Sequence, residues 1–440
     1  MTPVERFREL LAIPTVSHVD PAQTDTARFD EFHDALERLY PLVHRHLERE
    51  IVAGHALLYR WAGASSRDPL LLLAHQDVVD TAGQPWTRDP FAAVVEGEGV
   101  DATLYARGAI DDKGALVAIL EAVEQALADG VVPRADVWMA FGHDEETLGT
   151  GAQAIAALLA ERGVRPALVL DEGGAVVEGA LPGVGAPTAM IGVAERGSAT
   201  FELIAREAGG HASTPPSFPA TARLARAIDR VRRHPFPRRL VAPVRAMLAS
   251  AAAHAPEPVR TVFRRTALTA PVLTAAFALL GPETNALVRT TAVVTRLEGS
   301  AGDNVLATTA RATVNVRLLT GETISDAAIH LRRAVADPRI DIELRHGSDP
   351  SPVSPWQGTA WRRLAAAVRE TLGDEVIPLP YLQLGASDSR FYTGLTEHVY
   401  RFTPFHLTRA ERDALHAPDE RIRVEVWLRG IGFYRALLAS

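Results

Sequence analysis

The pattern of hydrophobic and polar positions predicts alternating strands and helices between residues 50 and 190. Short apolar runs suggest strands, and apolar residues recurring at helical spacing suggest helices. The strand-like runs are DPLLLLAHQD, ADVWMAFGHDEE and PALVLDEGG, and the helical stretches between them are DKGALVAILEAVEQALADG and GAQAIAALLAERG. This alternation predicts an α/β fold with a mixed, largely parallel sheet flanked by helices.

From about residue 196 the pattern changes and predicts an inserted α+β domain. Alternating strand-like residues and the helix PATARLARAIDRVRRH come first, followed by a helical segment at about 235–285 and then further strands. After residue 348, the helix and strand signals resemble those of the first region again. We therefore predict a larger domain made of residues 1–195 and 349–440, interrupted by a smaller domain at 196–348.

The first apolar run ends in residues that can carry chemistry. Residues 70–74 are LLLLA, which is typical of a strand buried on both faces, and His75, Gln76 and Asp77 follow directly. Because side chains two residues apart on a strand point the same way, His75 and Asp77 should share one face. Taken alone, such a pair is more often an ordinary hydrogen bond in a loop.

Composition narrows the class of protein. The 440 residues are 47% hydrophobic and 23% charged, with a net charge of −8 and no cysteine. Disulfides, thiolate ligands and a cysteine nucleophile are therefore excluded, and the charge argues against nucleic-acid and anionic membrane partners. The N-terminus predicts a capped helix from Thr2 to Leu11 rather than a signal peptide, and the apolar stretch around Pro271 is too short for a membrane span. We expect a cytoplasmic protein.

Acids and imidazoles recur at the ends of the predicted strands and in turns. They are His75, Asp77, Asp111, Asp112, Glu145, Glu146, Asp171 and His416. Adjacent carboxylates repel each other unless a cation compensates them, and nitrogen and oxygen ligands without thiolate suit zinc, cobalt or manganese. Each acid alone could equally be a solvated loop residue or a helix cap.

Taken together, the motifs resemble a known family. They are AHQDVVD, ARGAIDDKG, GHDEETLGTGA, LDEGG, GGHASTPP, GDNVLATTARATVNVR, GASDSRFY and LHAPDERI, in this order along the chain. The chain resembles the dizinc aminoacylase/carboxypeptidase family, and most of all its carboxypeptidase S and N-fatty-acyl-amino-acid hydrolase branch. The resemblance implies a zinc-peptidase type of fold whose inserted domain serves as a lid or for dimerisation.

The same resemblance implies a site with two divalent metal ions, zinc in the first place, with cobalt or manganese as alternatives. It assigns one ion to His75 and Asp171, the other to Glu146 and His416, and a bridging position to Asp111. Further implied roles concern the residues around the metals: Asp77 orients His75, Glu145 is the general base for a water between the ions, and a cis peptide bond follows Asp111.

For the substrate, the resemblance implies His211 as a donor to the oxyanion and Arg317 as the partner of a free carboxylate. Asn304 would hold the substrate backbone, and Asp388 and Arg390 would face the substrate, although the sequence Ala386–Ser387 departs from the family pattern there. His406 has no counterpart in the family pattern. The implied reaction is hydrolysis of the amide bond of an N-acyl amino acid or of a C-terminal peptide bond.

Several alternatives stay open at this point. A dipeptidase of the same family, a two-metal phosphoesterase and a binding protein without catalysis would share much of this signature. A homodimer through the inserted domain is possible, with His211 acting in its own or a neighbouring subunit. The apolar helices at about 235–285 could cover the dimerisation surface or line a channel for a long acyl chain, which we favour because burial of each methylene contributes ~0.8 kcal/mol.

Overall fold

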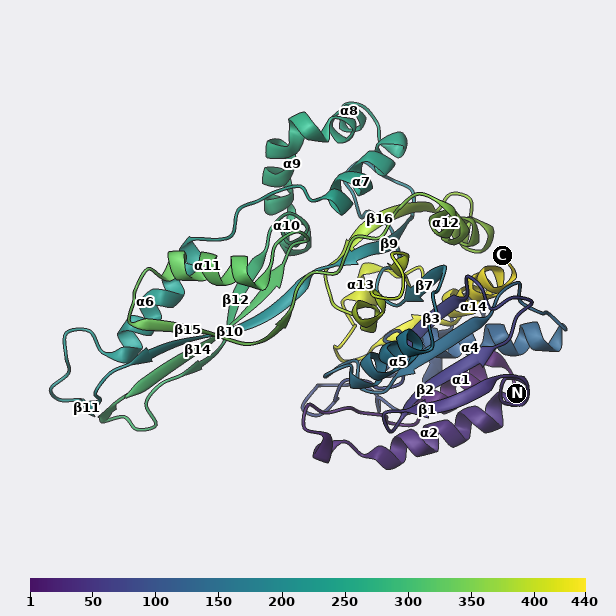
Figure 1. Ribbon diagram of the computed structural model, residues 1–440, viewed down its shortest axis with the longest axis horizontal. Helices are drawn as coiled ribbons and strands as arrows, with labels where there is room; N and C mark the ends of the chain where they lie inside the picture. The colour runs from purple at the N-terminus through teal and green to yellow at the C-terminus, as the bar shows by residue number, and fades with distance from the viewer.

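The computed structural model describes all 440 residues and has two parts, a larger α/β domain and an elongated arm (Figure 1). The chain leaves the larger domain after β9 (Thr188–Glu195) and enters the arm through β10 (Gly197–Arg206). It returns after β15 (Ile340–Ser348), and the C-terminal residues complete the larger domain. Both chain termini lie on the larger domain, far from the tip of the arm.

A mixed sheet forms the centre of the larger domain. Its main path contains, in spatial order, β1 (Glu48–Val52), β2 (Ala56–Trp61), β6 (Val137–Gly142), β3 (Leu70–His75), β7 (Leu168–Asp171), β17 (Val399–Arg401), β9 and β16 (Ile377–Gln383). The four strands from β6 to β17 run parallel, whereas β2 and β9 pair with them in the antiparallel sense. The predicted α/β fold with a largely parallel sheet is confirmed.

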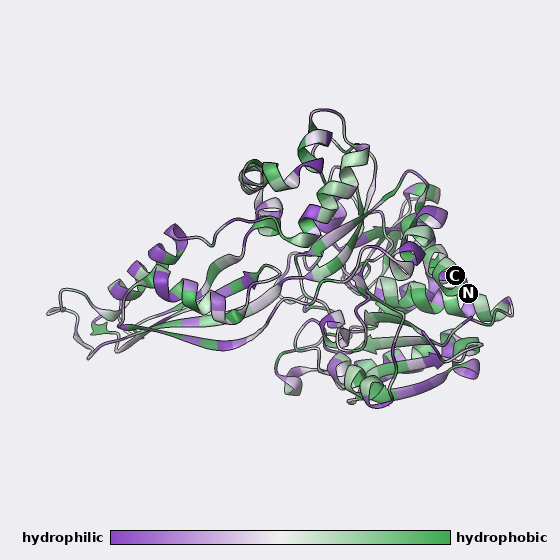
Figure 2. Ribbon diagram, turned by 45° about the horizontal axis from the view of Figure 1, so that its top comes forward, coloured by the Kyte–Doolittle hydropathy of each residue, from purple (hydrophilic) through white to green (hydrophobic).

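Strand β3 shows why the sheet needs helices on both faces. Leu70, Leu72 and Ala74 belong to the largest hydrophobic core, whereas Leu71 and Leu73 belong to a separate core on the opposite face. The first core is covered by α1 (Pro3–Leu11), α2 (Thr26–Leu39), α4 (Lys113–Ala128), α12 (Thr359–Leu372) and α14 (Val424–Ala439), and the second by α5 (Thr150–Glu161). In Figure 2 the central strands of the larger domain are coloured mainly as hydrophobic. An uninterrupted apolar run is therefore what this strand requires.

The first helix begins as the sequence predicts. The side chain of Thr2 accepts a hydrogen bond from the backbone N–H of Glu5 at 3.2 Å, and the Thr2 N–H donates to the Glu5 carboxylate at 2.7 Å. Pro3 occupies the first turn, where its missing N–H costs nothing. No helix of the structure is both long enough and apolar enough to cross a membrane.

The arm is an antiparallel sheet with helices on one face. Its strand order is β12 (Thr291–Glu298), β14 (Thr309–Leu318), β10 and β15, and α6 (Ala220–Arg233) and α11 (Ile324–Val335) pack against it. Buried and partly exposed residues alternate along β14, as expected for a sheet with a single covered face. At the far tip, β11 (Gly210–His211) pairs with β13 (Val305–Leu306).

The helical segment within the insertion packs against the larger domain rather than the arm. It consists mainly of α7 (Ala242–Ala251), α8 (Val259–Arg264), α9 (Thr266–Leu280) and α10 (Pro282–Val288). Val244, Leu248 and Phe277 are buried in the largest core, and α7 contacts β16 at the edge of the main sheet. The arm has its own core of 18 buried residues, none of which comes from these four helices. The segment is thus a layer of the larger domain, although it lies within the inserted stretch of sequence.

Candidate metal centre

One carboxylate faces two imidazoles at the carboxyl end of the parallel strands. Asp111 Oδ1 lies 3.1 Å from Nε2 of His75, and Asp111 Oδ2 lies 3.0 Å from Nε2 of His416. His75 is the last residue of β3, Asp111 precedes α4, and His416 follows the short helix α13 (Arg409–Arg412). The peptide bond between Asp111 and Asp112 is cis. Asp111 can therefore offer one oxygen to each of two cations.

Two glutamates complete two groups of potential ligands. One group contains His75, Asp111 and Glu172, and the other contains Asp111, Glu146 and His416. Within each group the ligand atoms lie within 4.8 Å of one another. Three nitrogen and oxygen ligands at each position suit a catalytic zinc-type ion, which keeps a further position open for water or substrate. The residues present therefore fit two divalent metal ions that share Asp111.

Glu172, not Asp171, accompanies His75, so the expected ligand set changes at this residue. Glu172 Oε1 lies 3.6 Å from His75 Nε2, whereas the Asp171 carboxylate accepts a hydrogen bond from the Ser389 N–H at 2.6 Å. Asp171 ends β7, and neighbouring residues of an extended chain point to opposite sides. The motif LDEGG contains both acids, and the sequence does not reveal which of them faces the metals.

Asp77 supports both sides of the centre. Its carboxylate lies 3.3 Å from His75 Nδ1 and accepts hydrogen bonds from the N–H groups of Glu145 and Glu146, each at 3.1 Å. The hydroxyl of Ser17 also donates to it, at 2.6 Å. Because Nδ1 of His75 faces Asp77, Nε2 is left for a metal, and the same carboxylate holds the loop that carries the two glutamates.

Glu145 lines the cavity of the site and belongs to neither ligand group. This cavity has a volume of about 440 Å³ and is also lined by Asp111, Glu146, Glu172 and His416. Burial raises the pKa of Glu145 well above its ordinary value, and the nearby charge of Glu172 raises it further. A carboxylate with a raised pKa is suited to accept and return a proton near neutral pH.

Glu420 is a residue that sequence reasoning missed. Its carboxylate accepts hydrogen bonds from the backbone N–H groups of Gly108 at 3.0 Å, Ile110 at 2.8 Å and Asp111 at 3.2 Å. It also pairs with the buried Arg107 at 2.7 Å. Glu420 thereby fixes the loop that presents Asp111. The stretch DER in LHAPDERI contains it, but its partners lie more than 300 positions earlier in the chain, so no local pattern could reveal them.

Two arginines line the same cavity as the acids. Arg317 reaches the cavity from β14 of the arm, and Arg390 reaches it from the 3₁₀ helix Asp388–Tyr392. Burial lowers the pKa of Arg317, and the neighbouring charge of Arg390 lowers it further. Neither guanidinium forms an ion pair, although Arg390 donates to the carbonyl oxygen of Ser387 at 3.2 Å. Two close unpaired cations make a site for an anionic group.

Asp388 does not line this cavity. Its carboxylate is buried against the backbone of Gly142 and Gly149, so closely that a Cβ at Gly142 would lie 2.4 Å from Oδ2. Burial raises the pKa of Asp388 well above its ordinary value. Asp388 thus lies behind the lining of the cavity, and its contact with substrate stays a prediction.

His211 and Asn304 lie at the tip of the arm and are exposed. His211 belongs to β11 and Asn304 directly precedes its partner strand β13, and this strand pair is at the end of the arm farthest from β3 and β7 (Figure 1). Neither residue lines the cavity. His406, for which the sequence offered no role, lies 3.4 Å from Glu178 and belongs to neither ligand group.

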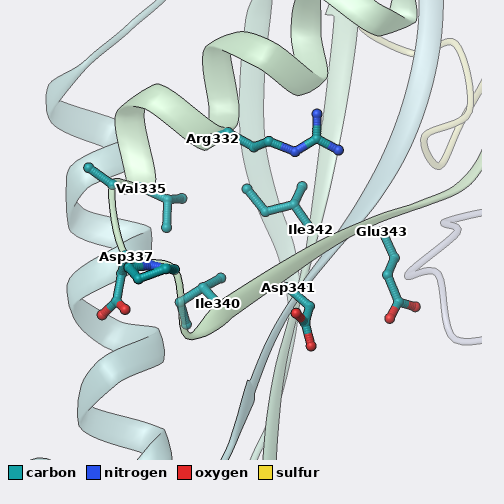
Figure 3. Close-up of a pocket in the computed structure, with 9 residues that line it drawn as sticks. Arg332, Val335, Asp337, Ile340, Asp341, Ile342 and Glu343 are labelled. Carbon is teal, nitrogen blue, oxygen red and sulfur yellow. The ribbon is translucent and has the colours of Figure 1, made fainter.

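A second cavity, of about 570 Å³, lies on the arm, where α11 ends and β15 begins (Figure 3). Its acids already have cationic partners. Asp337 pairs with Arg223 at 3.0 Å and with Arg226 at 2.8 Å, and Asp341 pairs with Arg206. This cavity therefore offers no free set of metal ligands.

Comparison with known proteins identifies the family. The sequence profile of peptidase family M20/M25/M40 matches residues 71–440. The chain belongs to this family. It is 32% identical over 442 residues to the human N-fatty-acyl-amino acid synthase/hydrolase PM20D1. This alignment covers 99% of this chain and 87% of the human protein. Carboxypeptidase S of Saccharomyces cerevisiae is 28% identical, over 98% of this chain and 82% of the yeast protein.

A solved structure shares the fold at low sequence identity. The M20 family metallo-carboxypeptidase Sso-CP2 from Sulfolobus solfataricus superposes with a TM-score of 0.71 and 18% identity, covering 100% of this chain and 98% of that structure. The resemblance inferred from the motifs is thus confirmed. The protein is a metallohydrolase of this family, and its ligand groups agree with the two-metal dependence typical of the family.

The protonation of His416 predicts how metal binding depends on pH. The hydrogen bond to Asp111, and next that to Glu146, raise the pKa of His416 to about 10 in the metal-free site. At pH 7 the imidazole is therefore protonated, and a metal ion has to displace that proton. Metal affinity should rise with pH up to about 10, and binding at pH 7 should release protons. Calorimetry in buffers of different ionisation enthalpy measures this release, and its absence at pH 7 would contradict the assignment of His416 as a ligand.

Proposed function

We propose that the protein hydrolyses the amide bond of N-acyl amino acids that carry a free carboxylate and a long acyl chain. The observation that carries this proposal is the pair of unpaired cations, Arg317 and Arg390, in the cavity that also contains the ligand groups. A substrate carboxylate can accept a forked pair of hydrogen bonds from a guanidinium there. The adjacent amide would then lie beside Glu145 and the ligand groups.

A neighbouring cavity supports the long acyl chain. It has a volume of about 640 Å³ and shares Gly173, Ala175, Gln383 and Gly385 with the metal cavity. Its apolar wall comes partly from the helical segment of the insertion and includes Met247, Leu280, Leu287, Tyr381 and Leu384. Burial of each methylene in such a wall contributes ~0.8 kcal/mol. The names of the human relative and its vertebrate counterparts agree with this substrate class.

Five residues would hold the two metal ions, for which we propose zinc. His75 and Glu172 would serve one ion, Glu146 and His416 the other, and Asp111 both. When bound, two such ions lower the pKa of a water molecule and polarise the scissile carbonyl. Glu145 would accept the proton of that water and return it to the nitrogen of the leaving amine. Asp77 would keep His75 in the required tautomer, because its backbone carbonyl oxygen lies 3.0 Å from His75 Nδ1 and its carboxylate lies 3.3 Å from the same nitrogen.

His211 is prepared to donate a hydrogen bond from Nε2. Its Nδ1 accepts from the backbone N–H of Ser213 at 3.1 Å and lies 2.7 Å from the Ser213 hydroxyl, so the proton of the neutral ring is on Nε2. Because the tip of the arm is distant from its own cavity, we propose that His211 serves the cavity of a second copy of the chain. There it would stabilise the oxyanion, and Asn304 would accompany it.

A panel of substrates tests the proposed class. For N-acyl phenylalanine, kcat/KM should rise from acetyl through octanoyl to palmitoyl, and the carboxamide analogue should react poorly because it lacks the anion. Arg317→Ala should lower kcat/KM about 10–100-fold for the acid and much less for the carboxamide, since a charge-assisted hydrogen bond is worth about 1.5–3 kcal/mol. Equal efficiency for acetyl and palmitoyl substrates would refute the acyl cavity, and equal efficiency for acid and carboxamide would refute the carboxylate site.

Glu145→Gln tests the general base. The variant should retain both metals and the fold but lose turnover by about 10²–10⁴-fold, because only the group that accepts the proton is changed. Elemental analysis and kcat measure the two properties separately. Asp111→Asn is the contrasting variant and should lose metal, because a neutral amide does not bridge two dications. Glu145→Gln with activity within tenfold of the wild type would exclude Glu145 as the base.

Mixing two inactive variants tests the placement of His211. His211→Ala and Glu145→Gln should each be inactive alone. If each arm serves the other subunit, a mixed dimer contains one site with both residues intact, and random mixing should restore roughly a quarter of the wild-type activity. Native mass spectrometry verifies that mixed dimers form. If these dimers recover no activity, or if the protein is monomeric at the assay concentration, action between subunits is excluded.

A further inference from the structure

A third group of potential metal ligands lies apart from the catalytic centre. It contains Asp30 and His33 on α2 and His55 just before β2, and the ligand atoms lie within 4.8 Å of one another. Asp30 and His33 are one helical turn apart, so both face the turn between β1 and β2. Asp30 Oδ1 is 3.4 Å from His55 Nδ1, close to the ~3.3 Å that separates two nitrogen or oxygen ligands of a tetrahedral zinc ion.

His55 contributes a buried nitrogen that has no hydrogen-bond partner. Its Nδ1 is inaccessible to solvent, and the nearby Asp30 oxygen does not meet it in hydrogen-bond geometry. An unsatisfied buried polar atom is costly, and such atoms in a native structure call for an explanation. A metal ion at this nitrogen would satisfy it. The exposed carboxylate of Asp30 leaves the group open to solvent, from which an ion can enter.

Gln76 orients the second imidazole. The Gln76 amide nitrogen donates to the carbonyl oxygens of His55, Phe141 and Gly142 at 2.9, 3.0 and 3.2 Å, so its Oε1 atom must face His33 Nε2, at 2.7 Å. His33 therefore donates from Nε2 and keeps an unprotonated Nδ1. A metal-binding histidine usually donates its other N–H to an oxygen in this manner.

We propose that Asp30, His33 and His55 bind a third divalent metal ion of the zinc type. Two imidazoles and one carboxylate supply three ligands, and water supplies the fourth. The ion connects α2 with the β1–β2 turn. Through His33 and Gln76, it also steadies the end of β3, where the neighbouring residue is the catalytic ligand His75. Its role is structural and separate from the hydrolytic reaction.

Zinc stoichiometry of the full-length protein tests the proposal. Dialysis against zinc followed by elemental analysis should give three equivalents for the wild type. In the Asp111→Asn background, which removes the catalytic ions, adding His55→Ala should remove one further equivalent. Adding His46→Ala, which removes an exposed histidine of the neighbouring helix α3 (Pro41–His46), should remove none. Asp30→Asn should raise the dissociation constant of this ion about tenfold or more.

Thermal unfolding supplies a second measurement. In the Asp111→Asn background, zinc should raise Tm, because an ion that binds only the folded state stabilises it. The same addition should leave Tm unchanged when His55→Ala is also present, and circular dichroism establishes that this variant is folded. If His55→Ala is unfolded, Asp30→Asn provides the same comparison. Equal zinc content of the Asp111→Asn protein with and without His55→Ala would overturn the proposal. An unchanged dissociation constant of the third ion in Asp30→Asn would also overturn it.

Discussion

The mutual repulsion of buried carboxylates is the constraint on which this structure depends. Asp111, Glu145, Glu146 and Glu172 line one cavity, and burial together with neighbouring negative charge raises the pKa of the three glutamates. Without a cation, such a group can relieve its repulsion only by taking up protons. Two divalent ions would remove the repulsion and retain the carboxylates in their ionised form. The same arrangement leaves Glu145, which belongs to neither ligand group, free to exchange a proton.

Two further carboxylates hold the loops in place against this repulsion. Asp77 accepts the N–H groups of Glu145 and Glu146, and Glu420 accepts those of Ile110 and Asp111. Each therefore fixes backbone rather than a single side chain, so the ligands of both groups are oriented before a metal arrives. This preorganisation matters because a misoriented ligand lowers the affinity for the metal even when all the ligand residues are present. Both supporting acids are completely buried, where their hydrogen bonds do not compete with water.

The division between the larger domain and the arm separates two tasks. The ligand groups and the neighbouring cavity with its apolar wall belong mainly to the larger domain, because α7 and its neighbouring helices pack into that domain's core. The arm contributes Arg317 near its base and His211 at its tip. Under the proposed function, recognition of the acyl chain would rest on a fixed surface of the larger domain, whereas the donor to the oxyanion would depend on how the distant tip of an arm meets a cavity. Assembly of the complete site would then be conditional on that encounter.

The sequence by itself determined the features that follow from local periodicity. The apolar run of β3, the shared face of His75 and Asp77, the Thr2 capping box and the order of strands and helices all depend on residues a few positions apart. The motifs also identified the family. Only the tertiary structure decided which acid of Asp171 and Glu172 joins His75, that Glu420 fixes the Asp111 loop, and that the helices within the insertion pack on the larger domain. It alone brought Asp30, His33 and His55 together. These outcomes depend on contacts between residues that are far apart in the chain. The local sequence pattern does not reveal which of two adjacent side chains makes such a contact.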